Sequence, residues 1–216
     1  MNRIITLFVS LFVVLAVSAQ SDQNAKSLLE QTSKKMQSYA SMSANFVFTM
    51  ENSRMNIKEE NSGSLLLKGK KYQVNLPDLG MKVYSDGKTV WNLMEAAGQV
   101  MITNVGDDSQ GGIDPSAIFN IYQEGYTFKF VEDKQEGGKT ISYVDLFPDD
   151  KNAEFSKIRV GVDKSGLMVQ SLVTHGKDGN QYGIYVRDYK TGLAIADSEF
   201  VYDKTKHRNI EEIDFR

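Results

Sequence analysis

The chain of 216 residues contains no cysteine, so it can form neither a disulfide framework nor a thiolate metal or redox centre. It has only two histidines, His175 and His207, and they are not paired at a ligand spacing, so the sequence offers no pattern for a zinc site. An excess of basic charge is also missing, because 25 basic and 28 acidic residues give a net charge of −3. This balance offers no electrostatic footprint for nucleic acid, whose binding would need a clearly basic face.

Catalytic motifs are absent as well. No serine lies in a Gly-x-Ser-x-Gly nucleophile elbow, and Gly111-Gly112 is not followed by the lysine and serine or threonine of a phosphate-binding loop. The acidic pairs, such as Asp149-Asp150, lack the spacing of an EF-hand. We therefore expect a protein that is not an enzyme and that uses no metal ion or other cofactor.

The one long apolar run lies at the N-terminus. Arg3 precedes an apolar stretch over residues 4–17, and small residues surround Ala19. A basic start, a run too short for a comfortable membrane span and a small-residue cleavage site are typical of a secretory signal peptide. We predict a cleaved signal peptide over residues 1–19, with an uncleaved anchor as the alternative. Residues 20–216 are then one domain, exported to the periplasm and soluble there.

Two stretches have helical periodicity. Residues 21–40 repeat apolar residues at helical spacing. Residues 114–125 begin with Asp114-Pro115, which suits a first helical turn, and end at Gly125, which suits a helix terminus. Apolar side chains surround much of this short second helix, so it must pack on another apolar surface. The apolar side chains of the helix are Ile118, Phe119, Ile121 and Tyr122.

Most of the remaining chain alternates apolar and polar residues with period two and is interrupted by turn sequences, which is typical of antiparallel strands. We predict a mainly β fold with helices (α+β), an open and strongly curved antiparallel sheet that forms an incomplete barrel, with a helical lid over an apolar cavity. Asp86-Gly87 predicts a hairpin with a two-residue turn. Alternation puts Trp91, the only tryptophan, on one face with Thr89 and Leu93, which we assign to the concave side. Trp91 then either packs in the core or lines the cavity.

Four segments together resemble the outer-membrane lipoprotein carrier (LolA-like) family. The most specific is Ser-Asp-Gly-Lys-Thr-Val-Trp over residues 85–91. The others are "YASMSANFVFTM", "GSLLLKGKKYQVNL" and the ending "EFVYDKTKHRNIEEIDFR", in the order in which the family has its counterparts. The resemblance implies a monomeric carrier whose apolar cavity shelters the acyl chains of lipoproteins. It would receive them from an inner-membrane ABC exporter and deliver them to an outer-membrane receptor or membrane.

The resemblance and the alternation together predict the residues that contact the acyl chains. Two alternatives stay open: a binding module for another lipid, and an envelope sensor of the same fold. The predicted lipid-binding residues are Phe46, Phe48, Leu65, Leu67, Val74, Leu76, Met81, Val83, Trp91, Leu93, Ile118, Phe119, Ile121, Tyr122, Phe128 and Phe130.

The sequence departs from the family at one position. Studied members have an arginine after the Val-Lys of the second strand, which holds the lid closed, and Gly69 stands there in this chain. We therefore expect a lid held mainly by apolar contacts, which an arginine at position 69 would close more firmly if the backbone there does not need glycine.

Overall fold

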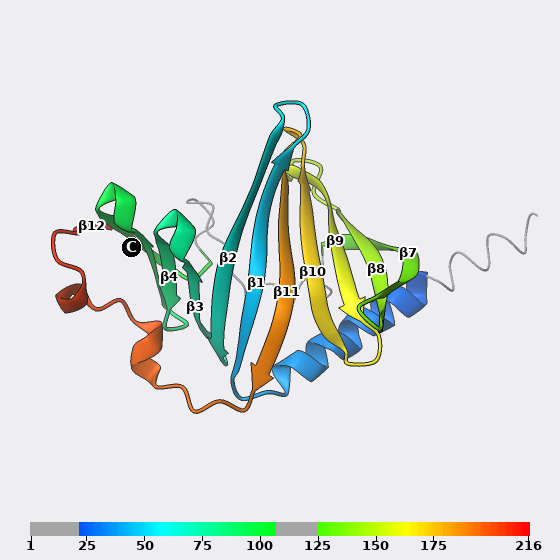
Figure 1. Cartoon of the computed structure of the whole chain (residues 1–216), viewed down its shortest axis with the longest axis horizontal. Coiled ribbons are helices and arrows are strands. Elements are labelled where there is room, and N and C mark those ends of the chain that lie inside the picture. The colour runs from blue at the N-terminus through cyan, green and yellow to red at the C-terminus, as the bar shows by residue number, and fades with distance from the viewer. Residues whose placement is uncertain (1–21, 107–124) are drawn as a thin grey trace, which may run out of the picture.

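The computed structural model describes residues 22–106 and 125–216, so the predicted signal peptide and the predicted helix residues 114–124 lie outside the described residues. Within the described part, the strands form one sheet in the order β12-β6-β5-β4-β3-β2-β1-β11-β10-β9-β8-β7 (Figure 1). The strands are β1 (Met42–Asn52), β2 (Ile57–Lys68), β3 (Lys71–Leu76), β4 (Met81–Ser85), β5 (Thr89–Met94), β6 (Gln99–Asn104), β7 (Tyr126–Glu136), β8 (Lys139–Pro148), β9 (Phe155–Asp163), β10 (Met168–Gly176), β11 (Gln181–Thr191) and β12 (Glu211–Asp214).

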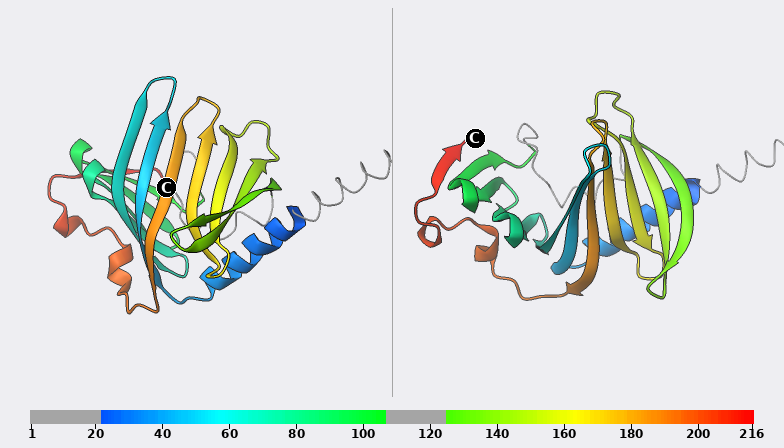
Figure 2. Two further views of the ribbon diagram at one scale, coloured as in Figure 1. Left: turned by 45° about the vertical axis from the view of Figure 1, so that its right-hand side comes forward. Right: turned by 45° about the horizontal axis from the view of Figure 1, so that its top comes forward.

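The sheet consists of two antiparallel meanders joined side by side. Strands β1 to β6 form one meander and β7 to β11 the other, and β1 pairs with β11 along ten residue pairs to connect them. The sheet is strongly curled and its order ends at β12 and β7 without closing (Figures 1 and 2). This architecture confirms the predicted open, curved antiparallel sheet.

The predicted hairpin after β4 is present, with a longer turn than expected. Residues 86–88 lie outside the strands, and Gly87 adopts a φ of +88°, which favours glycine. The Asp86 carboxylate accepts hydrogen bonds from the backbone N–H groups of Lys88 and Thr89, both at 2.8 Å. The Asp86 side chain therefore fixes the turn, as is common for aspartate in tight turns.

A helix over residues 22–37 lies across the lower part of the concave face of the sheet (Figures 1 and 2). Ala25, Leu29 and Met36 are buried at helical spacing and pack against the strands. The Asp22 carboxylate accepts a hydrogen bond of 2.8 Å from the backbone N–H of Phe130, so this end of the helix is bonded to edge strand β7. In the part of the chain that the structure describes, no helix is long and apolar enough to cross a membrane.

The C-terminal strap, residues 192–216, runs along the opposite face of β3 to β6 (orange to red in Figure 1). It contains the short 3-10 helices η5 (Asp197–Phe200) and η6 (Lys204–Lys206) and ends in β12, which pairs in parallel with β6. Phe200 is completely buried, although it belongs to a segment with little regular structure. The strap therefore contributes to the core of the fold.

Candidate functional site

A continuous apolar surface covers the concave face of the sheet. We call it the concave cluster. Its buried side chains come from the helix, from β1 to β4 and from β8 to β10, so it spans both meanders: Ala25, Leu29, Met36, Met42, Phe46, Leu67, Tyr72, Val74, Leu76, Val83, Val144, Leu146, Ile158, Val160, Val162 and Val169.

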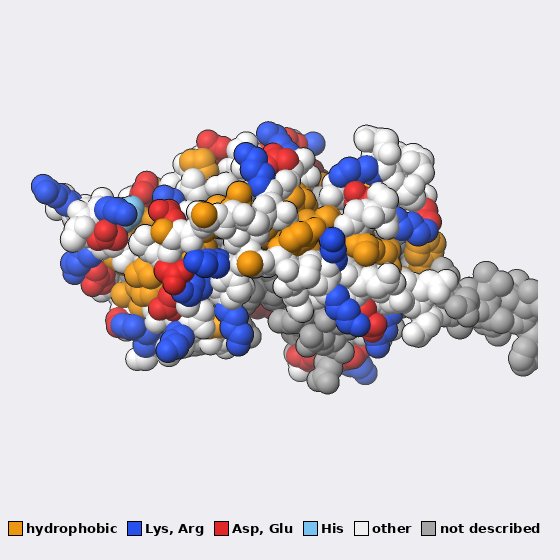
Figure 3. All heavy atoms as spheres, turned by 90° about the horizontal axis from the view of Figure 1, so that it is seen from below, with side chains coloured by type: hydrophobic (Ala, Val, Ile, Leu, Met, Phe, Trp, Pro, Cys, Tyr) orange, Lys and Arg blue, Asp and Glu red, His pale blue; other side chains and the backbone are white. Residues whose placement is uncertain are grey.

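Several large apolar side chains of this cluster remain partly exposed. They surround the buried residues on both halves of the curved sheet, so the concave face still offers apolar surface to a ligand. Hydrophobic side chains are also visible between charged ones when the molecule is seen from below (Figure 3). The partly buried members include Phe48, Leu65, Met81, Val90, Tyr126, Phe128, Phe130, Phe155, Leu172 and Ile184.

Polar chemistry on this face is sparse. Asn92 lies opposite Val83 and so faces the concave cluster. Its buried Oδ1 and the buried Oγ1 of Thr32 on the helix have no hydrogen-bond partner among the residues that the structure describes. Burial raises the pKa of Tyr189, whose hydroxyl donates to the Val169 carbonyl at 2.6 Å, so this tyrosine stays neutral. Among the described residues, no group of three histidine or acidic side chains could hold a metal ion. The arrangement suits an apolar ligand.

The structure places ten of the sixteen predicted lipid-binding residues in the concave cluster. The structure shows where these ten side chains lie, and their contact with lipid stays a prediction. Another four, Ile118, Phe119, Ile121 and Tyr122, lie outside the described residues. The ten are Phe46, Phe48, Leu65, Leu67, Val74, Leu76, Met81, Val83, Phe128 and Phe130.

The predicted face of Trp91 and Leu93 is wrong. Trp91 pairs directly with Tyr84, and cross-strand partners share a face. That face is opposite to the concave cluster, because Trp91 and Leu93 pack with Tyr84 and with Tyr202 of the strap. Alternation correctly grouped Trp91 with Leu93, but it could not tell which of the two faces was concave.

The backbone at Gly69 does not meet the condition set for an arginine at this position. It lies in the turn between β2 and β3 with a φ of +60°, and an added Cβ would meet no atom within 4 Å. An arginine there would therefore extend from a turn, with backbone strain, and would have no side-chain or backbone neighbour at its Cβ. Gly69→Arg is therefore not expected to close the lid more firmly.

Sequence reasoning missed part of the cluster. It did not assign Leu146, Val160 or Ile184 to the site, although the alternation identified all three as strand residues. It also left the helix residues Ala25 and Leu29 out, although their spacing marked an apolar helix face. The missing information was the β1–β11 pairing, which brings the second meander beside the first.

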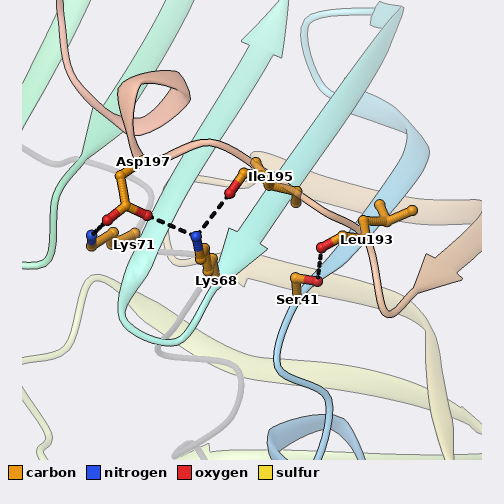
Figure 4. Close-up of polar contacts among 6 residues, drawn as sticks. All are labelled: Ser41, Lys68, Lys71, Leu193, Ile195 and Asp197. Carbon is orange, nitrogen blue, oxygen red and sulfur yellow. Dashed lines mark hydrogen bonds and ion pairs between the residues drawn. The ribbon is translucent and has the colours of Figure 1, made fainter.

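A polar cluster fastens the strap to the β2–β3 turn (Figure 4). Lys68 Nζ donates to the Ile195 carbonyl and pairs with Asp197, each at 2.8 Å, and Lys71 Nζ lies 2.7 Å from the other Asp197 carboxylate oxygen. These hydrogen bonds lower the pKa of Asp197 to about 2. The Ser41 hydroxyl donates to the Leu193 carbonyl at 2.6 Å, so the strap is anchored from its first residues.

Comparison with known proteins agrees with this architecture. The family model for outer membrane lipoprotein carrier protein LolA matches residues 37–203. A search of curated protein sequences gave no significant match. An uncharacterized conserved protein from Thermus thermophilus has a TM-score of 0.60 at 12% identity, over 88% of this chain and 99% of that chain.

Two further solved structures are similar. A DUF1329 family protein from Desulfovibrio piger has a TM-score of 0.50 at 11% identity, over 87% of this chain and 99% of its own. A LolA superfamily protein from Nitrosomonas europaea has a TM-score of 0.45 at 14% identity, over 82% and 97%. At such low identity, the first two similarities show a shared fold and nothing more.

The fold and its concave cluster define a class of protein, an open β half-barrel with an apolar concave face. Because the family model covers most of the chain, the particular family follows. The chain belongs to the outer membrane lipoprotein carrier protein LolA family.

Proposed function

We propose that this protein binds lipid acyl chains on the concave cluster and carries acylated lipoproteins from the inner to the outer membrane. The observation that carries the proposal is the apolar concave face, built from both meanders and the helix and partly exposed in each half. Membership of a lipoprotein carrier family supports it. The same surface would suit another acylated lipid, so that alternative is part of the test.

The energetics favour transfer by direct contact. Burial of one methylene contributes about 0.8 kcal/mol, so an acyl chain of about fifteen methylenes gains on the order of 12 kcal/mol over water. Release into water would therefore be very slow. The carrier needs a donor and an acceptor that offer apolar surface of their own, and we propose an inner-membrane ABC exporter as donor and an outer-membrane receptor or membrane as acceptor.

A matched pair of variants tests the binding surface. Leu65 belongs to the concave cluster, whereas its neighbour Leu66 points to the opposite face of β2, and both side chains are partly buried. Leu65→Asp should weaken binding of a fluorescent fatty acid about tenfold or more, because a carboxylate in apolar surroundings is costly to desolvate. Leu66→Asp should leave the affinity near that of the wild type. Equal affinities in two folded variants would remove the concave face from the site.

The identity of the cargo needs a separate experiment. Lipids extracted from the purified protein, together with the fate of lipoproteins after depletion of its gene, separate a lipoprotein carrier from a binding module for another lipid. Lipoproteins that stay in the inner membrane on depletion would support the carrier. An envelope sensor would leave lipoprotein sorting intact.

The place of action is part of the same proposal. We propose that the protein is a periplasmic monomer, without enzymatic activity, whose mature chain begins near Gln20 after removal of a signal peptide. N-terminal sequencing of the protein from the periplasmic fraction tests this. Recovery only from membranes with residues 1–19 intact would contradict it.

A further inference from the structure

One end of the sheet carries a basic and partly apolar surface, which we call the basic rim: Lys70, Lys88, Val105, Phe215 and Arg216. These residues come from the β2–β3 turn, the β4–β5 turn, the end of β6 and the residues after β12. All five are exposed. Segments that are far apart in the sequence thus contribute to one surface.

Backbone contacts hold the parts of the rim together. The Val105 N–H donates to the Lys88 carbonyl at 2.8 Å, and the Phe215 N–H donates to the Ile102 carbonyl at 2.9 Å. A Cβ built on Gly87 would lie 3.3 Å from the Lys70 Cβ, so the two turns touch. The C-terminus lies beside the end of β6 (Figure 2). The rim is therefore a fixed part of the fold.

The rim residues and the described residues paired with them carry an excess of basic charge. Lys68 and Lys71 lie in the same turn region as Lys70. The basic side chains in this region are Lys68, Lys70, Lys71, Lys88 and Arg216, and the acidic ones are Asp86, Asp197 and Asp214. The chain as a whole has a net charge of −3. Asp197 engages Lys68 and Lys71, whereas no ion pair among the described residues engages Lys70 or Lys88. Their ammonium groups are available to an anionic partner.

Two large apolar side chains lie among these charges. Val105 is 42% exposed and Phe215 is 47% exposed. Each gains from leaving water only if the partner offers an apolar layer as well as negative charge. A bilayer with anionic headgroups offers both, because lysine and arginine remain at the headgroups while apolar side chains enter the interface.

We propose that the basic rim docks the protein on bilayers that contain anionic phospholipids. This inference is independent of the proposed function, because it concerns a surface on the rim and not the acyl-chain site on the concave cluster. It gives the chain an orientation at the membrane, with the ends of β2, β4 and β6 toward the headgroups.

Vesicle co-sedimentation of the mature chain tests the proposal. Vesicles of phosphatidylcholine mixed with phosphatidylglycerol should bind the protein, and binding should weaken as salt is raised, because screening reduces attraction between exposed charges. Vesicles of phosphatidylcholine alone should bind it weakly. Binding to a single-stranded oligonucleotide with no binding to anionic vesicles would overturn the proposal in favour of a different polyanion.

Two charge-reversal variants locate the surface. In Lys70→Glu/Lys88→Glu, the loss of two lysines should weaken vesicle binding by about thirtyfold or more. The variant leaves the ion pairs of Lys68 and Lys71 with Asp197 of the strap in place. The control, Arg54→Glu/Lys151→Glu, makes the same change in net charge at exposed positions on the opposite end of the sheet. The control should bind vesicles clearly better than the rim variant, and equal binding by the two would overturn the proposal.

A third variant tests the apolar part of the rim. Val105→Ser/Phe215→Ser should weaken binding while the remaining dependence on salt persists. Fatty-acid binding should be unchanged in every rim variant, so loss of vesicle binding and loss of acyl-chain binding are separate outcomes. Wild-type affinity of the serine variant for anionic vesicles would contradict insertion of these side chains.

Discussion

The rings of Tyr84 and Tyr202 meet edge to face, with centroids 6.3 Å apart and planes inclined by 64°. Tyr84 belongs to β4 and Tyr202 to the strap, so this contact joins the strap to the sheet on the face opposite the concave cluster. Tyr202 also stacks on His207 at 5.3 Å. Trp91 packs against the apolar group that contains Tyr84 and Tyr202 and is therefore a reporter of the strap.

Trp91 emission should respond to the strap and not to cargo. Tyr202→Ala should shift Trp91 emission to longer wavelength, because removing the ring exposes the indole to water. Saturation with a non-fluorescent fatty acid should leave the emission wavelength of the wild type unchanged. A shift caused by the fatty acid that exceeds the shift caused by Tyr202→Ala would show that Trp91 faces the ligand.

Asp197→Asn should loosen the strap. The variant loses the charge that pairs with Lys68 and Lys71, so amide exchange over residues 192–200 should accelerate, while the central strands keep their protection. Hydrogen exchange measured by mass spectrometry checks this. Asp150→Asn, at an exposed position beyond β8, is the control and should leave exchange in the strap as it is.

The same ion pairs predict how strap attachment depends on pH. The pKa of Asp197 is lowered to about 2, so the attachment is fully present above the ordinary carboxyl pKa of about 3.9 and is lost only as the pH falls through about 2. Exchange in the strap, corrected for its intrinsic pH dependence, should therefore be constant between about pH 5 and pH 8. A step in this range would assign the attachment to another titrating group.

The sequence predicted the kind of sheet because alternation and turn residues are local. β3 shows this well, since Tyr72, Val74 and Leu76 are buried on one face while the residues between them are half-buried. The face that each strand turns toward the concave side is set by pairing and curvature, which no local pattern contains. For this reason Trp91 and Leu93 were assigned to the wrong face.

The strap shows a second limit of local reasoning. Phe200 and Tyr202 are buried without belonging to a periodic segment, because long-range contacts with β3 and β4 order them. The β12–β6 pairing is parallel and joins segments more than one hundred residues apart. A resemblance at the end of the sequence indicated that this segment belongs to the domain, but it could not indicate which face the strap covers.

The ring of Phe46 leaves no room for a side chain at position 63, where Gly63 stands. A Cβ added at Gly63 would lie 2.5 Å from Cε2 of Phe46 and 2.8 Å from Cδ2 of Leu76, within the concave cluster. Gly63→Ala should therefore destabilise the fold by about 1–3 kcal/mol through overpacking. Urea unfolding measures the free energy. Ser64→Ala, on the other face of β2, is the matched control and should change stability by less than about 0.5 kcal/mol.

A double-mutant cycle separates this clash from a general loss of strand propensity. Phe46→Leu removes the ring that crosses Gly63, so Gly63→Ala should cost less in the Phe46→Leu background than in the wild type. Equal costs in both backgrounds would contradict the clash.

Asp145 stabilises the second meander through a buried charge cluster. It accepts hydrogen bonds from Arg159 Nε at 2.6 Å, from Arg159 Nη2 at 2.9 Å and from Lys157 Nζ at 2.8 Å, and its side chain is 7% exposed. Burial alone would raise the pKa of Asp145, but the bonds from Arg159 and Lys157 outweigh it and hold the pKa below its ordinary value. Asp145→Asn should destabilise the fold by about 1–3 kcal/mol at neutral pH, less than for a fully buried pair, because both basic side chains still reach water.

The pH dependence of that loss identifies its cause. Because the pKa of Asp145 is lower in the folded protein than in the unfolded chain, its stabilising contribution is present above about pH 4 and is lost as the pH falls through the lower folded value. The difference in unfolding free energy between wild type and Asp145→Asn should thus be constant above about pH 7 and shrink under acid conditions; His175, whose charged form Asp145 favours, adds to the difference as it protonates. Glu154→Gln, which changes an exposed carboxylate just before β9, should stay close to the wild type throughout. A difference that stays the same in acid would assign the loss to the shape of the asparagine side chain and not to the charge of Asp145.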